Sequence, residues 1–144
     1  MVLKPLALAS LAVALACASS SSITEPAVYT QIEAADSVRI RVGQTIVVEG
    51  VRVIFGAVVN DSRCPVDVVC VWAGDAEAQF AVELNCDCRA PTYALNLHTT
   101  LEPRSGDAYG FRVTLLRVLP EPRSTTVILP GSYSAWIRLV KLPS

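Results

Sequence analysis

Apolar and polar residues alternate with a period of two along most of the chain after residue 36. The pattern is clearest in residues 77–84, where Ala78, Phe80, Val82 and Leu84 share one face and more polar residues occupy the other. A period of two is typical of a β-strand with one buried face. By this criterion we predict strands at 38–42, 45–49, 51–59, 77–84, 93–98, 109–115 and 133–139.

Two of these segments depart from simple alternation. Residues 51–59 are apolar on both faces, which predicts a central strand covered on two sides. In the segment that begins at Tyr109, the alternation breaks at Leu116 and Val118, which indicates a β-bulge.

Turn-forming residues separate the predicted strands, and no window after residue 36 has a convincing helical period. The predicted fold is therefore all-β: a single antiparallel β-sandwich, immunoglobulin-like or a related barrel, of about seven or eight strands. A tight turn leads into Tyr133, as in the tyrosine corner of immunoglobulin-like sandwiches, where the hydroxyl pins a crossing loop.

The N-terminal residues predict export. Lys4 precedes an apolar run from Leu6 to Ala16, which is shorter than the ~20 residues of a transmembrane helix and suits a secretory signal. We therefore predict a signal peptide at 1–16, with cleavage before Cys17. Without this segment, which carries one cation, the formal net charge moves from −1 to −2. That charge gives no electrostatic basis for binding nucleic acid or anionic lipid.

The sequence Val13-Ala14-Leu15-Ala16-Cys17 resembles the lipobox of bacterial lipoproteins. The resemblance implies acylation of Cys17 and anchoring to a bacterial membrane, the outer membrane in a diderm cell. The alternative is ordinary cleavage at the same bond, which would give a soluble secreted or periplasmic protein. Serine-rich residues after Cys17 predict a flexible tether over 17–35, with the sandwich domain at 36–144.

Four further cysteines suit an oxidising compartment, and they allow three disulfide pairings. Cys86 and Cys88 would close a very small ring, which favours pairing each of them with Cys64 or Cys70. The short segment between Cys64 and Cys70 also closes easily, so these residues alone leave the pairing open.

The segment Asp61-Ser62-Arg63-Cys64-Pro65, followed by Cys70-Val71-Trp72-Ala73-Gly74, resembles a signature of uncharacterised bacterial secreted proteins and lipoproteins. In that family a D-S-R-C-P turn precedes C-x-W-A-G and an alternating strand. The resemblance implies a Cys64–Cys70 disulfide and leaves the partners of Cys86 and Cys88 uncertain. It implies no function.

Several side chains admit both a structural and a functional interpretation. We expect Trp72 to pack on a disulfide in the core, and Trp136 to be the better candidate for an exposed aromatic. We expect His98, the one histidine, to be a solvated surface residue. Asp61 and Arg63 are expected to tie their turn together.

Metal binding is a minority interpretation of two further sets. Cysteines 86 and 88 together with His98 would suit zinc or copper(I). Three aspartates near the signature could gather around calcium: Asp61, Asp67 and Asp75. We predict no metal and no cofactor.

The sequence contains no hydrolase elbow, zinc-protease motif or phosphate-binding loop. We therefore expect a non-catalytic, lipid-anchored envelope protein that binds or scaffolds an unknown protein or small molecule. One alternative is a periplasmic metal-binding or thiol-redox protein that uses Cys86, Cys88 and His98. Another is an inhibitor of secreted hydrolases that presents residues 61–70.

Overall fold

The structure is a computed structural model that describes residues 30–31 and 37–143. These residues are all-β, with one short 3₁₀ helix, η1 (Pro130–Ser132), and no α-helix among them. One sheet contains, in spatial order, β1 (Thr30–Gln31), β3 (Thr45–Val48), β4 (Val51–Asp61), β5 (Ala76–Leu84) and β6 (Tyr93–His98). The other contains β2 (Ser37–Arg41), β9 (Ser134–Lys141), β8 (Phe111–Leu119) and β7 (Ser105–Ala108).

All neighbouring strands pair antiparallel except β1, which runs parallel to β3. The inward residues of both sheets form one hydrophobic core. At its centre Phe55 of β4 stacks on Phe80 of β5, with the ring centroids 4.9 Å apart. The alternation in residues 77–84 thus places one apolar face of β5 in the core.

The structure also corrects the expectations in places. β4 is a central strand of its sheet, but it is not covered along its whole length: Val59, where the register against β5 shifts, is 51% exposed. The predicted bulge is confirmed, because the register of β8 against β9 shifts between Leu115 and Arg117. β7 lies where we predicted a turn; its Gly106 passes so close to Leu95 of β6 that an added Cβ would lie 2.8 Å from that side chain.

The N-terminal predictions fall largely outside the described residues. The predicted signal peptide and Cys17 lie outside the residues that the structure describes. Two residues of the predicted tether, Thr30–Gln31, are described and form β1. No helix in the described part of the chain has the length and hydropathy needed to cross a bilayer.

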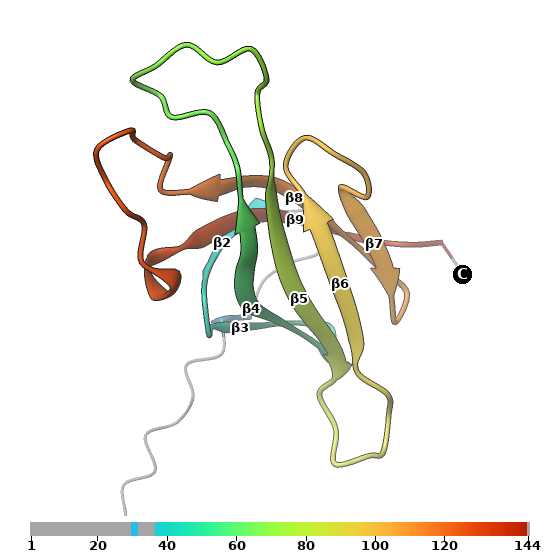
Figure 1. Cartoon of the computed structure of the whole chain (residues 1–144). Helices are drawn as coiled ribbons and strands as arrows, with labels where there is room; N and C mark the ends of the chain where they lie inside the picture. Colours follow the sequence, from blue (N-terminus) through green and yellow to red (C-terminus); the bar gives the residue numbers. More distant parts are fainter. Residues whose placement is uncertain (1–29, 32–36, 144) are drawn as a thin grey trace, which may run out of the picture.

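The loops gather at two ends of the strands (Figure 1). At one end, which we call the signature end, lie loops 62–75, 99–104 and 120–133; loop 62–75 projects furthest, at the top of the view. The loop at 85–92 lies at the opposite end, beyond the nine residues of β5. A strand of that length spans ~30 Å, so the two ends are well separated.

Candidate functional site

The base of loop 62–75 continues the β4–β5 pairing as a narrow hairpin. The Ser62 N–H donates to the Asp75 carbonyl at 2.7 Å, and the Cys64 N–H donates to the Ala73 carbonyl at 2.9 Å. Gly74 has φ +69°, and a Cβ there would lie 1.9 Å from the Ser62 carbonyl oxygen. Only glycine therefore fits this position of the signature.

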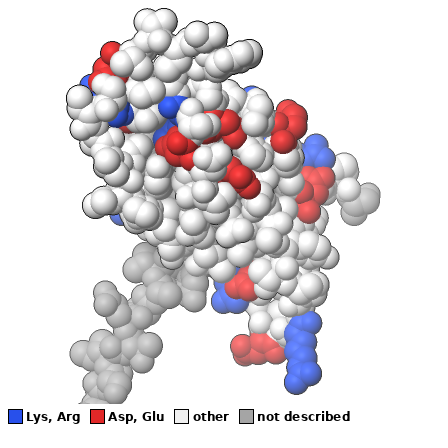
Figure 2. Space-filling model, in the orientation of Figure 1, with Lys and Arg blue, Asp and Glu red and all other residues white. Residues whose placement is uncertain are grey.

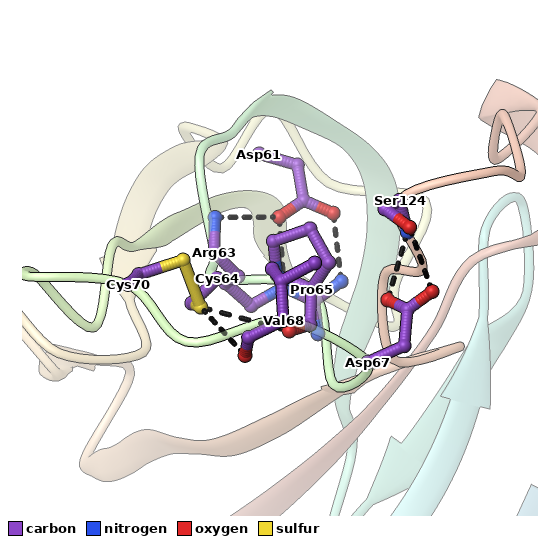
Figure 3. The surroundings of a disulfide bond; sticks show 8 residues. All are labelled: Asp61, Arg63, Cys64, Pro65, Asp67, Val68, Cys70 and Ser124. Atoms are coloured by element: carbon purple, nitrogen blue, oxygen red, sulfur yellow. Dashed lines mark hydrogen bonds and ion pairs between the residues drawn. A yellow bond between two sulfur atoms is a disulfide. The ribbon is translucent and has the colours of Figure 1, made fainter.

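The cysteines of the signature stand at disulfide-bonding positions, as the family resemblance implies. Cys64 and Cys70 have Cα atoms 5.9 Å apart and their sulfur atoms meet (Figure 3). The link closes the outer part of the loop just above the hairpin base. It limits the conformations of the segment that carries Val66, Val68 and Val69.

Asp61 and Arg63 fasten the loop to the second sheet. The carboxylate of Asp61 receives Arg63 Nε at 2.8 Å and Nη2 at 2.7 Å, a bidentate pair (Figure 3). Arg63 also donates to the carbonyl oxygens of Val118, at 2.6 Å, and Pro120, at 3.0 Å. The expectation that Asp61 and Arg63 tie the turn together is met, and the tie extends to the end of β8.

Tyr133 completes this cluster. Its hydroxyl donates to Asp61 Oδ2 at 3.0 Å across 72 residues of sequence, rather than to backbone a few residues upstream as in a tyrosine corner. Burial acts to raise the pKa of Asp61, but the hydrogen bonds and charge of Arg63 outweigh it and hold that pKa below its ordinary value. Burial and the hydrogen bond to Asp61 raise the pKa of Tyr133. Asp61 is therefore ionised and Tyr133 neutral at physiological pH.

A second attachment holds loop 62–75 to loop 120–133. The Val66 N–H donates to the Pro122 carbonyl at 2.9 Å. The carboxylate of Asp67 receives the Ser124 N–H at 2.9 Å and its hydroxyl at 2.7 Å (Figure 3). These two bonds from Ser124 lower the pKa of Asp67. The projecting loop is thus braced from two sides.

The outer part of the braced loop is apolar and exposed, contrary to expectation. Trp72 is 82% exposed, so it does not pack in the core, whereas Trp136 is half-buried in β9. We call the five large apolar residues that the loop exposes the apolar tip: Val66, Val68, Val69, Val71 and Trp72. In Figure 2 the outermost part of the loop, at the top of the view, shows no charged side chain.

The apolar tip stands out from the rest of the described surface. Three more of the exposed large apolar side chains lie on the other loops of the signature end, namely Leu101, Val127 and Leu129. An open groove of about 320 Å³ is lined by Trp72 and Leu101 together with Ser62, Ala73, Gly74, Asp75 and Thr100. Exposed apolar surface concentrated at one end of a domain marks an interaction site.

Asp75, which lines this groove, and His98 form a second polar cluster. His98 Nδ1 lies 2.6 Å from Asp75 Oδ2, and the other oxygen receives the Thr100 and Leu101 N–H groups at 2.8 and 3.3 Å. The hydroxyls of Thr99 and Thr100 also donate to that oxygen. Burial acts to raise the pKa of Asp75, but hydrogen bonds from His98 and Thr100 hold it far below its ordinary value.

His98 is therefore not the solvated surface residue that the sequence suggested. The β5–β6 register sets Glu77 opposite His98, which brings this histidine beside Asp75, the residue just before β5. The cluster holds loop 99–104 against the hairpin base. No local pattern in the sequence indicates this contact, because the two partners are 23 residues apart.

Neither metal interpretation finds its ligands assembled. Asp61, Asp67 and Asp75 each bind different partners, and among the described residues no three His, Cys, Asp or Glu side chains are placed to hold a metal. Cys86 and Cys88 lie in loop 85–92, whereas His98 lies at the other end of β6.

The remaining cysteines pair with one another. Cys86 and Cys88 have Cα atoms 5.2 Å apart at disulfide-bonding positions. The expectation drawn from ring size alone, crosswise pairing with Cys64 or Cys70, is not met, because the two cysteine pairs lie at opposite ends of β5, whereas the Cys64–Cys70 pairing that the family resemblance implies is present. Ring size, on which that expectation was based, matters less than the separation that the fold imposes.

No protein-family model, curated protein or solved structure matches the chain.

Proposed function

We propose that this chain is a non-catalytic, lipid-anchored β-sandwich protein of the bacterial envelope, and that its apolar tip is the binding element. The sandwich is supported by the single core that both sheets share. The anchor is supported by the lipobox-like sequence before Cys17. The lack of catalytic motifs in the sequence supports a binding or scaffolding role.

The exposure of the tip is the observation on which the binding role depends. Val69, Val71 and Trp72 are between 82% and 102% exposed, so they contribute nothing to the core. Two ties nevertheless position the loop that carries them: Arg63 to the end of β8, and Asp67 to Ser124. A rigid loop loses little conformational entropy when it binds, which favours a recognition role over a loosely attached connection.

The anchor is tested by labelling cells with a radioactive fatty acid and fractionating them. The full chain should carry label and sediment with membranes, and Cys17→Ser should lose the label. The double variant Cys86→Ser/Cys88→Ser is the matched control and should stay labelled. An unlabelled wild-type chain in the soluble fraction would contradict the anchor.

The binding role is tested with the exported Cys17→Ser chain, which lacks the proposed lipid. It should sediment with washed envelopes of the producing bacterium, and the variant Val69→Ser/Val71→Ser/Trp72→Ser should not, at unchanged folding stability. Val140→Ser, an exposed valine at the opposite end, is the control and should bind as before. Equal sedimentation of all three would contradict a role for the tip.

A second candidate function is inhibition of a secreted hydrolase by loop 62–75. The observation that favours it is that this loop projects and is closed by a disulfide. It predicts that the exported chain lowers the activity of hydrolases secreted by neighbouring cells, and that Trp72→Ser relieves this effect.

A further inference from the structure

We propose that the apolar tip inserts into a lipid bilayer surface, so that the domain contacts the membrane through its signature end as well as through Cys17. This inference rests on the proposed function, because it identifies the partner of the same apolar tip. It commits to lipid rather than to a protein or a second copy of the chain.

The composition of the tip suits the boundary between lipid headgroups and acyl chains. Four valines and one tryptophan are exposed together, and tryptophan favours the membrane interface, where its ring meets both apolar and polar surroundings. Residues 65–72 carry one charge, that of Asp67, and Ser124 already binds both of its oxygens. Insertion of residues 68–72, with Val66 and Asp67 left among the headgroups, therefore desolvates no charged group.

The backbone of the loop is also partly prepared for an apolar environment. The N–H groups of Cys64, Val66 and Val68 already donate to carbonyl oxygens of Ala73, Pro122 and Pro65. A backbone group without a partner is costly to move into lipid, and these bonds reduce that cost at the base of the tip.

The predicted anchor keeps the tip within reach of the membrane. The chain from Cys17 to Thr30 can span at most about 45 Å, at ~3.5 Å per residue. Thr30 pairs with Ile46, which pairs with Val53 of β4. From Val53 to the end of β4 at Asp61 is ~26 Å, so the signature end can turn toward the bilayer that holds the lipid. This confinement raises the effective concentration of membrane around a weakly inserting loop.

The charge of the chain distinguishes insertion of the apolar tip from electrostatic adsorption to the membrane. The mature chain has a formal net charge of −2 once Lys4 is removed, and the apolar tip contains no cation. We therefore expect binding to zwitterionic phosphatidylcholine vesicles that changes little with salt. Attraction through basic residues would instead require anionic lipid and weaken steeply as salt rises.

Tryptophan fluorescence in vesicles tests the inference. The chain contains two tryptophans, so Trp72→Phe leaves Trp136 as the internal control. The lipidated chain is reconstituted into phosphatidylcholine vesicles, with or without bromine on the acyl chains, which quenches tryptophan at that depth. We expect strong quenching and a blue shift of emission in the wild type, and neither in Trp72→Phe.

Partitioning of the exported Cys17→Ser chain onto the same vesicles provides the second measurement. Val69→Ser/Val71→Ser should weaken it by about a hundredfold, because each of the two inserted valines contributes roughly tenfold. Val140→Ser should not weaken it.

The two proposals fail in different ways. If the lipidated chain is membrane-bound but Trp72 is not quenched, the insertion is refuted and the anchor stands. If the Cys17→Ser chain binds envelopes but not vesicles, the tip has a protein partner and the insertion is likewise refuted. A blue shift of Trp72 that depends on protein concentration without lipid shows self-association instead and overturns it too. If the wild-type chain carries no fatty-acid label, the anchor alone is refuted.

Discussion

Replacing Asp75 by alanine tests how loops 62–75 and 99–104 are held together. Asp75 is buried, and its carboxylate receives hydrogen bonds from His98, Thr99, Thr100 and Leu101. Asp75→Ala removes all of these bonds and leaves the donors without an acceptor.

The expected loss follows from the exposure of the donors. Thr100 and Leu101 are exposed, so water replaces the carboxylate there and their bonds contribute little to the difference. His98 and Thr99 are half-buried. Hydrogen bonds to a charged group contribute roughly 1.5–3 kcal/mol each, so two such bonds give a loss of about 3 kcal/mol in the free energy of unfolding.

Urea unfolding at pH 7 with the disulfides intact, followed by circular dichroism, measures this loss. The control is Asp107→Ala, because Asp107 pairs with Arg112 while both side chains are well exposed. Its loss should stay below about 1 kcal/mol. A loss for Asp75→Ala no larger than that of the control would refute the reasoning.

The stability that Asp75→Ala loses relative to the wild type should depend on pH. The pKa of Asp75 in the folded chain lies below its ordinary value of 3.8, so its stabilising contribution is complete above about pH 4 and falls as the pH drops toward the folded pKa. The difference in stability between the wild type and Asp75→Ala should therefore be constant near neutral pH and shrink in acid. A difference that grew as the pH fell would contradict this assignment.

Three further predictions concern the same end of the domain. Gly74→Ala should lower the free energy of unfolding, measured in urea, by more than about 2 kcal/mol, because its φ is +69° and the new Cβ would meet the Ser62 carbonyl. Gly131→Ala is the control and should lower it far less, because the space around Gly131 is open. Tyr133→Phe should lower stability by about 1–2 kcal/mol by removing the hydrogen bond to Asp61, and the loss should vanish when Asp61 is already alanine. Cys64→Ser/Cys70→Ser should cost about 2 kcal/mol, the chain-entropy value for so short a loop, and an unchanged urea midpoint would contradict the role given to this link.

The strands were predictable where one face is buried. In β5 the predicted range 77–84 differs from the observed Ala76–Leu84 by one residue, because alternation records which side chains enter the core. β7 was missed because Ser105, Gly106 and Asp107 have little strand preference. Its conformation comes from pairing with β8 and from the close approach of Gly106 to Leu95.

Contacts within the site could be predicted only between residues that are close together in the sequence. Asp61 and Arg63 are two residues apart, so their tie could be inferred from turn chemistry. The contacts from Tyr133 to Asp61 and from His98 to Asp75 depend on how distant strands meet. The burial of Trp72 was predicted wrongly, because a tryptophan beside a disulfide packs in the core only if another segment covers it. A sign was present in the run from Val68 to Trp72, which is apolar but has no alternation to give it a buried face.

The mass of the intact exported protein tests the central claim most directly, because one spectrum reports both processing and cross-linking. We predict a chain that begins at Cys17, carries the added mass of its acyl groups, and weighs four hydrogens less than the fully reduced polypeptide, since each disulfide removes two. A chain that still begins at Met1, has no acyl mass and contains every cysteine as a free thiol would contradict the account.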